Sequence, residues 1–266
     1  MSKVLSSTLN NLIQISLEVG SNLINYKKNN KIKSNWIGDQ LKTNADIYAN
    51  EFWIKRLKQK FSNFDLISEE DNSSQIKLTN NFNGFILDPI DGTRSYVDNF
   101  KSYVTQVAHI INGQIVSSVV YSPELNLLFY AEKNKGAYLN RKKIKKKIIT
   151  DFSKSILVDN YPSPTSLINK IINYNQIPHY KESGSLGLKI SMVASNMANI
   201  MVKPNKCKIW DIAPPLLILS ELSGKLYEFN GKLIDINNLK KNNFNGLIAL
   251  SNKLDISKII NLIKKI

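Results

Sequence analysis

The fold and the chemistry of this chain can both be argued from one stretch, Phe85-Ile86-Leu87-Asp88-Pro89-Ile90-Asp91-Gly92-Thr93. Its three leading apolar residues are typical of the end of a buried strand, and two carboxylates follow within four positions. Pro89 fixes its own φ and favours an extended Asp88, while Gly92 permits a tight or closely approached backbone. Carboxylates bind Mg²⁺ and the N–H groups of a helix start bind anions. The stretch therefore predicts a corner for a divalent cation and a phosphate together.

The composition is that of an ordinary globular protein, with 42% hydrophobic and 21% charged residues in 266. No apolar run approaches the roughly 18 residues of a membrane span, and residues 1–30 lack the pattern of a signal peptide. The single cysteine, Cys207, excludes an internal disulfide framework and fits a reducing compartment. We expect a cytoplasmic protein that does not enter a membrane.

The chain is strongly basic, with 36 Lys and Arg against 21 Asp and Glu and a net charge of +15. Such a field favours the encounter with a phosphorylated substrate. The same charge could reflect compositional drift on solvated faces, since the chain is rich in Asn, Ile and Lys together. A lysine-rich run at 141–147 is open to two interpretations, a nucleic-acid patch or an edge hairpin protected by its lysines, and we favour the edge hairpin.

The apolar spacing predicts an alternation of helices and strands with no boundary that splits the chain. We expect one domain over residues 1–266, with lobes of roughly 1–150 and 151–266 that share a cleft. Residues 27–33 are predicted to be a loop, and the Asn-Gly at 112–113 is typical of a hairpin. Predicted helices cover 4–26, 46–61, 163–174, a segment through 193–198, 213–222 and 254–266, and predicted strands cover 64–67, 85–87, 104–111, 114–121, 127–132, 135–139, 155–159, 179–182, 200–202, 224–233 and 246–251.

Acidic residues recur near the predicted element ends. Thr43 or Asn44 could cap the second helix, and Asp46 would then lie in its first turn. On sequence alone, the favoured interpretation of Asp46 is a negative charge that stabilises the helix N-terminus. The acids at 69–71 follow one strand about twenty residues before Asp88, so the two strand ends could lie side by side around a shared cation. Asp211 stands at another predicted helix start, where Pro214 and Pro215 would be tolerated in a first turn.

With these motifs in hand, the chain resembles the inositol monophosphatase superfamily of lithium-sensitive, magnesium-dependent phosphatases over nearly its whole length. The resemblance is carried by Ser68-Glu69-Glu70-Asp71, by Asp88-Pro89-Ile90-Asp91-Gly92-Thr93 and by Trp210-Asp211, with Asp46 upstream. It implies an α/β layered fold, an α-β-α-β-α sandwich. In two departures, the family's Pro-Val-Thr before the first aspartate is Gln40-Leu41-Lys42-Thr43 here, and Gly187 stands where the family usually has a larger residue.

The resemblance also implies a role for each matching residue. Two or three Mg²⁺ ions would be held by Glu69, Asp88, the carbonyl of Ile90, Asp91 and Asp211. Asp46 and Thr93, with Glu69, would activate the attacking water, and the amides of Gly92 and Thr93 would receive the phosphate.

Within the superfamily, Ser-Glu-Glu-Asp and the segment Gly184-Ser185-Leu186-Gly187-Leu188-Lys189 resemble the CysQ-type 3′(2′),5′-bisphosphate nucleotidases. Ser185 and Lys189 would then bind substrate, and lysines 203, 206 and 208 suit a second phosphate. The expected reaction is hydrolysis of the 3′-phosphate of adenosine 3′,5′-bisphosphate. Hydrolysis of inositol-1-phosphate, another polyol or sugar phosphate, or histidinol phosphate is the alternative.

The expected partners are a small phosphorylated substrate and at most a second copy of the chain in a homodimer. A nucleic-acid-binding protein is the rival from another functional class, motivated by the net charge. It would bind with an affinity that falls steeply with salt and does not depend on Mg²⁺.

Overall fold

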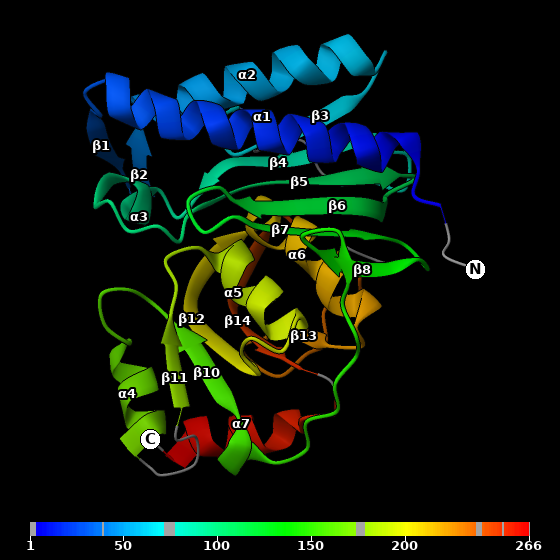
Figure 1. Cartoon of the computed structure of the whole chain (residues 1–266). Helices are drawn as coiled ribbons and strands as arrows, with labels where there is room; N and C mark the ends of the chain where they lie inside the picture. Colours follow the sequence, from blue (N-terminus) through cyan, green and yellow to red (C-terminus); the bar gives the residue numbers. More distant parts are fainter. Residues whose placement is uncertain are drawn as a thin grey trace.

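Five layers, α-β-α-β-α, build the molecule, with two helices on the outside, a large sheet, two inner helices, a smaller sheet and two further helices (Figure 1). The computed structural model describes residues 4–38, 40–71, 78–173, 179–237, 241–251 and 253–265. The α/β layered sandwich that the resemblance implies is confirmed. The division into lobes at about residue 150 stays a prediction.

The first layer consists of α1 (Ser7–Asn29) and α2 (Asn44–Lys60), which lie across one face of the large sheet (Figure 1). Both helices were predicted, but α1 runs three residues into the segment expected to be a loop. Thr43 is the N-cap of α2, since its hydroxyl accepts hydrogen bonds from the amides of Ala45 and Asp46. The first turn of α2 is thereby fixed beside the large sheet.

The large sheet has the strand order β3-β4-β5-β6-β7-β8-β9. The antiparallel meander from β5 to β7 is confirmed, and β3 joins it as a strand parallel to β4. Strand β4 is buried along all eight residues and continues through Asp91, beyond the end that we predicted at Leu87. The strands are β3 (Asp65–Ser68), β4 (Gly84–Asp91), β5 (Val104–Ile111), β6 (Gln114–Ser122), β7 (Leu127–Glu132), β8 (Gly136–Leu139) and β9 (Lys142–Lys143), and the short helix α3 (Thr93–Val97) follows β4.

The inner helices α5 (Leu186–Ala194) and α6 (Ile209–Glu221) lie between the two sheets (Figure 1). Their apolar side chains share one core with residues of both sheets, which explains why nearly every residue of these helices is buried. The smaller sheet is mixed and has the order β11-β10-β12-β14-β13. Its strands are β10 (Ile156–Asp159), β11 (His179–Glu182), β12 (Ile200–Lys208), β13 (Lys225–Glu228) and β14 (Asn243–Leu250), and the 3-10 turn Phe152–Lys154 with the outer helices α4 (Ser166–Asn173) and α7 (Ile256–Lys265) completes the fold.

A small antiparallel hairpin, β1 (Ser34–Ile37) and β2 (Gln40–Thr43), was not predicted. Its turn contains Gly38 at φ +58°, a conformation that favours glycine. Trp36 and Ile37 are 61% and 66% exposed, so no buried face produced the alternation by which strands are recognised in a sequence.

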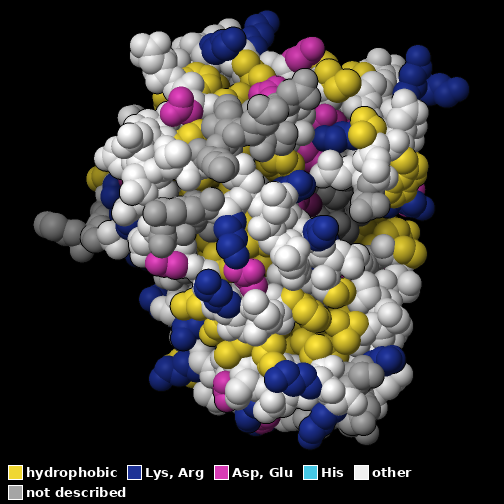
Figure 2. Space-filling model, turned by 180° about the vertical axis from the view of Figure 1, so that it is seen from behind, with side chains coloured by type: hydrophobic (Ala, Val, Ile, Leu, Met, Phe, Trp, Pro, Cys, Tyr) yellow, Lys and Arg dark blue, Asp and Glu magenta, His cyan; other side chains and the backbone are white. Residues whose placement is uncertain are grey.

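The lysine-rich run at 141–147 includes β9, which forms the edge of the large sheet, as the favoured interpretation required. On the face seen in Figure 2, Lys and Arg side chains are scattered and do not gather into one stripe. Within the described ranges, no helix is long and apolar enough to cross a membrane.

Candidate functional site

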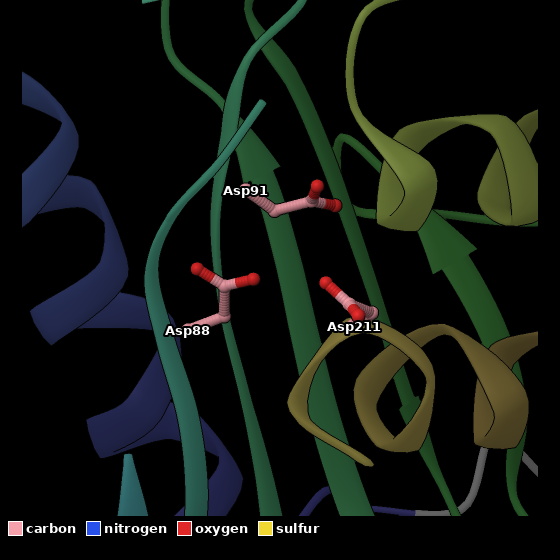
Figure 3. A group of neighbouring side chains, drawn as sticks. All are labelled: Asp88, Asp91 and Asp211. Atoms are coloured by element: carbon pink, nitrogen blue, oxygen red, sulfur yellow. The ribbon is translucent and has the colours of Figure 1, made fainter. Parts of the chain in front are cut away.

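Three aspartates converge between the large sheet and the inner helices. Asp88 and Asp91 come from the end of β4 and Asp211 from the first turn of α6, and one carboxylate oxygen of each lies within 4.8 Å of the others (Figure 3). The pairing of β4 with β5 is irregular between Asp88 and Asp91, where Pro89 has no N–H to donate to the ladder. This break lets both aspartates point toward Asp211.

Asp88 is the least solvated of the three and is 0% exposed. Both of its carboxylate oxygens lack a hydrogen-bond partner among the described residues. A buried ionised carboxylate without partners is costly. Its position therefore calls for a bound cation or a proton.

Asp91 is held by the start of α5. Its carboxylate accepts hydrogen bonds from the Ser185 hydroxyl at 2.7 Å, the Leu186 amide at 3.1 Å and the Gly187 amide at 2.5 Å. A Cβ on Gly187 would lie 2.0 Å from the side-chain oxygen of Gln106, so a larger residue here would require the Gln106 side chain to move. The sequence marked Gly187 as a departure from the family, and the close packing supplies its physical reason.

Asp211 accepts a hydrogen bond from the Lys208 amide at 2.5 Å, the helix-start role expected for it. The prolines at 214 and 215 lie inside α6 and not in its first turn, which corrects our prediction. Since proline has no N–H, the carbonyls of Trp210 and Asp211 lose their helical donors, and the Gln106 side-chain amide donates to them at 3.1 and 3.5 Å. Gln106 thus ties the Asp211 turn to β5, a role that its sequence context did not signal.

Asp46 and Thr93 form a second hydrogen-bonded group. The Thr93 hydroxyl lies 3.2 Å from Asp46 Oδ1 and 3.1 Å from the Ile90 carbonyl, and its one proton can go to either. Asp46 also accepts from the Thr43 amide at 2.8 Å, which completes a capping box. The helix-start role and the contact with Thr93 are therefore both present.

Glu69 follows β3, whose parallel pairing places Ser68 beside Leu87 and so brings the two acidic strand ends together, as expected. Glu69 lies outside the aspartate triad, although it lines the same pocket. Its carboxylate is 3.2 Å from the ammonium of Lys42, which also contacts Glu70 at 2.5 Å. Lys42 was noted in the sequence only as a departure, and its ion pairs depend on the unpredicted hairpin.

The carboxyl groups of the site share one electrostatic situation. Burial is the largest cause that raises their pKa values, to about 6 for Asp46 and about 7 for Asp211. Burial and the neighbouring Glu69 raise the pKa of Asp88 well above its ordinary value. For Glu69, burial raises the pKa to about 8 against the opposing charge of Lys42. Because ionisation of these buried carboxyl groups is unfavourable, a bound cation would stabilise their charged form strongly.

These residues fit a divalent metal site. The donors are hard carboxylate oxygens from β4 and from the first turn of α6, the kind of ligand that Mg²⁺ and Ca²⁺ take. The two carboxylate oxygens of Asp88 support a metal site independently of the residue types, because no described residue donates a hydrogen bond to them.

Two adjoining cavities surround the triad. The first, of about 290 Å³, gathers most of the predicted site residues: Glu69, Asp88, Ile90, Asp91, Gly92, Thr93 and Asp211. The second, of about 810 Å³, shares Asp91 and Asp211 with the first and is also lined by lysines 189, 203, 206 and 208. Trp36 of the hairpin lies at the first cavity and Ile37 at the second.

Two of the predicted substrate-binding residues have different surroundings. Lys189 lines the larger cavity and its ammonium donates to the Asn160 side chain. Burial lowers the pKa of Lys189 to about 8, with the charge of Asp159 opposing. Ser185 is fully buried as the N-cap of α5 and donates to Asp91, so it positions Asp91, and its contact with substrate stays a prediction.

The family model described as inositol monophosphatase family matches residues 4–265. Among curated proteins, an inositol monophosphatase of Dictyostelium discoideum is 27% identical over 245 residues, which cover 89% of this chain and 90% of that protein. The Escherichia coli K12 protein named Nus factor SuhB is 26% identical over 236 residues, covering 84% of this chain and 85% of the relative.

Solved structures share the fold over almost the whole chain. An IMPase/NADP phosphatase in complex with NADP and Ca²⁺ superposes with a TM-score of 0.82 at 22% identity and covers 98% of this chain and 97% of its own. A 2′AMP-bound SaIMPase-II superposes with a TM-score of 0.78 at 22% identity and covers 96% of this chain and 93% of its own.

Proposed function

The chain belongs to the inositol monophosphatase family, a family of metal-dependent phosphatases, and from this premise we propose that it hydrolyses the 3′-phosphate of adenosine 3′,5′-bisphosphate to AMP and phosphate. The observation that carries the proposal is the lysine-lined cavity beside the aspartate triad. A ligand with one phosphate at the triad can place a second phosphate among these lysines. A polyol monophosphate would leave the lysines without an anionic partner.

The aspartate triad, with Glu69 and the Ile90 carbonyl, would hold Mg²⁺ in this reaction. When bound, the ions supply positive charge to the phosphate and to the attacking and leaving oxygens. The carboxylates would hold the positive charge of the ions inside the protein, where its interaction with the phosphate is screened less than in water.

Thr93 and Asp46 would accept the proton of the attacking water. The Thr93 hydroxyl, 3.2 Å from Asp46 Oδ1, can direct its own proton to Asp46 and accept a hydrogen bond from the water. The capping box fixes Asp46 and the buried end of β4 fixes the Ile90 carbonyl, so the relay needs no rearrangement of backbone. The amides of Gly92 and Thr93, at the start of α3, would face the phosphate.

The cavity dimensions also suit a nucleotide. Its volume of about 810 Å³ lies in the range of about 300–1,000 Å³ that is usual for small-molecule sites. Lys203 lines both cavities and so stands where the two ends of a ligand would meet. The nucleotides bound by two fold relatives, 2′AMP and NADP, make a nucleotide ligand reasonable for this fold.

Inositol-1-phosphate, other sugar phosphates and histidinol phosphate are the competing substrates. One relative is an inositol monophosphatase by name, which keeps this alternative open. Phosphate release should be compared across adenosine 3′,5′-bisphosphate, inositol-1-phosphate, histidinol phosphate and fructose-1,6-bisphosphate, with kcat/KM measured for each.

Adenosine 3′-monophosphate serves as the matched control, because it differs from the proposed substrate only by the second phosphate. We expect the bisphosphate to have at least a tenfold higher kcat/KM, on the order of 1.4 kcal/mol in transition-state binding. Equal kcat/KM for the two nucleotides, or a higher value for inositol-1-phosphate, would overturn the proposed substrate. Inhibition by lithium at fixed Mg²⁺, which the family resemblance implies, can be measured in the same assay.

A further inference from the structure

Lys42 places a fixed positive charge at one end of the acidic site. Its Nζ lies 3.2 Å from Glu69 Oε1, 2.5 Å from Glu70 Oε1 and 3.2 Å from the backbone oxygen of Glu69. The backbone oxygen of Glu69 and Glu70 Oε1 accept hydrogen bonds from this ammonium, and Glu69 Oε1 forms an ion pair with it. The chain itself therefore holds a cation against Glu69.

The surroundings of Lys42 distinguish this group from a surface ion pair. The side chains of Lys42, Glu69 and Glu70 are 18%, 13% and 9% exposed, so solvent screens their interaction only partly. Lys42 also stands where the family pattern has a valine, which could make no such contact.

The acidic site consequently has two unequal ends. At the triad, Asp88 has no partner among the described residues and lies within 4.8 Å of Asp91 and Asp211. At the other end, Glu69 is paired with Lys42, whose ammonium it shares with Glu70. A divalent cation that used Glu69 would have to share the carboxylate with an ammonium or displace it, whereas a cation at Asp88 would displace no hydrogen-bond partner of that carboxylate among the described residues.

We propose that Lys42 is a positioning residue that acts as a built-in cation at Glu69 and weakens the binding of a divalent ion at this end of the site. The triad then binds its cation more tightly than the Glu69 end does. The proposal requires metal dependence, which comes with the family, and does not depend on which phosphate ester is hydrolysed.

The test is a calorimetric titration of the metal-free protein with Mn²⁺ in the absence of substrate. In Lys42→Met, which keeps the length of the side chain and removes its charge, we expect the weakest resolved Mn²⁺ to bind about tenfold more tightly, or one further Mn²⁺ to become measurable. Lys42→Arg keeps the charge and should stay within threefold of the wild type.

Lys135→Met provides the matched control. The Lys135 ammonium lies 2.8 Å from the Glu132 carboxylate in an ion pair, and neither residue lines either cavity. It should leave Mn²⁺ binding within threefold of the wild type. The proposal is overturned if Lys42→Met tightens Mn²⁺ binding by less than threefold without a further ion, or if Lys135→Met tightens it as much.

A thermal melt of each metal-free variant checks that it folds. If Lys42→Met does not fold, Lys42→Val, with the residue of the family pattern, is titrated in its place under the same criteria. Since no substrate is present, a wrong substrate assignment would leave the outcome of this titration unaffected.

Discussion

The two adjoining cavities of the candidate site are lined by different kinds of side chain. The triad end consists of short carboxylates on a buried strand and a helix start, with Asp88 at 0% and Asp91 at 7% exposure. The lysine end consists of long side chains on β12, of which Lys203 and Lys208 are half-buried and Lys206 is exposed. The positions of the reacting groups are thus set by main chain that cannot move without loss of the core. The positions of the groups proposed to choose the substrate are set by flexible side chains.

The largest effect should come from substitution within the triad. Asp88→Asn and Asp91→Asn should each lower kcat by about 10³ or more, since each removes an anionic metal ligand. Their stabilities should differ in the metal-free protein. Asp88→Asn replaces a buried carboxyl that must either carry an unpartnered charge or take up a proton on folding, so it should raise the melting temperature. Asp91→Asn disturbs three hydrogen bonds at the start of α5 and should cost about 2 kcal/mol.

The control for this pair is Asp98→Asn, which alters an exposed ion pair with Arg94. It should change neither kcat nor the melting temperature measurably. Retained turnover in either triad variant would contradict the assignment of these aspartates as metal ligands. A lower melting temperature for Asp88→Asn would contradict the conclusion that Asp88 has no partner among the described residues.

The pH dependence of stability should be the next largest effect. The folded-state pKa values of Asp46, Asp211 and Glu69 are raised to about 6, 7 and 8, so the folded protein holds more protons than the unfolded chain between about pH 4 and about pH 8. These groups therefore stabilise the metal-free protein least above their folded pKa values. Bound Mg²⁺ should reverse this loss.

The measurement is the difference in melting temperature between protein in excess Mg²⁺ and protein in EDTA. We expect this difference to grow by about 5 °C or more as the pH rises through the window set by those pKa values. A difference that is constant or shrinks with rising pH would contradict the proposed link between burial and metal binding.

Substitution at the lysine end should be weaker and selective. Lys206→Met should raise the KM for adenosine 3′,5′-bisphosphate by about tenfold through loss of a contact to the second phosphate, with kcat little changed. The KM for adenosine 3′-monophosphate should not change. Lys232→Met, an exposed lysine outside the lining of either cavity, is the control. Equal effects on both nucleotides would assign Lys206 to general electrostatic attraction.

The smallest effect should come from the hairpin. Trp36 is 61% exposed at the smaller cavity, and an indole can stack on a base. Trp36→Ala should raise the KM for adenosine 3′-phosphates by about fivefold, on the order of 1 kcal/mol, and leave inositol-1-phosphate unaffected. Trp36→Phe should retain most of the affinity. A loss shared by both substrates would speak against stacking.

Sequence patterns predicted most of the secondary structure because most elements bury apolar residues in a core. The apolar periodicity of α1 reflects its buried face, and β5, β6 and β7 are buried at nearly every residue, because helices cover both faces of the large sheet. The hairpin at 34–43 was missed because β1 is exposed along its whole length and β2 is buried only at Thr43. The prolines of α6 were misplaced because Gln106, distant in sequence, satisfies the carbonyls that they leave without donors.

The carboxylates of the candidate site were also predictable from the sequence, whereas several of their contacts were not. Its carboxylates stand next to strand ends and helix starts, where their residue types carry a signal, and they do converge. The contact of Ser185 with Asp91 was not predicted, because the distance between α5 and β4 cannot be read from either segment alone, and its contact with substrate stays a prediction. Lys42 acquired its role only through the hairpin that brings it to Glu69 and Glu70.

The sequence by itself determined the family, the layered α/β fold and the residue types available for metal-dependent phosphate chemistry, since these depend on local pattern and on motifs along the chain. Only the tertiary structure decided which carboxylates have partners. Asp88 is unpartnered among the described residues, Asp91 caps α5 and Glu69 is paired with Lys42. The physical reason is that the charge state of a buried carboxylate depends on neighbours within a few ångströms, and here those neighbours come from distant parts of the chain.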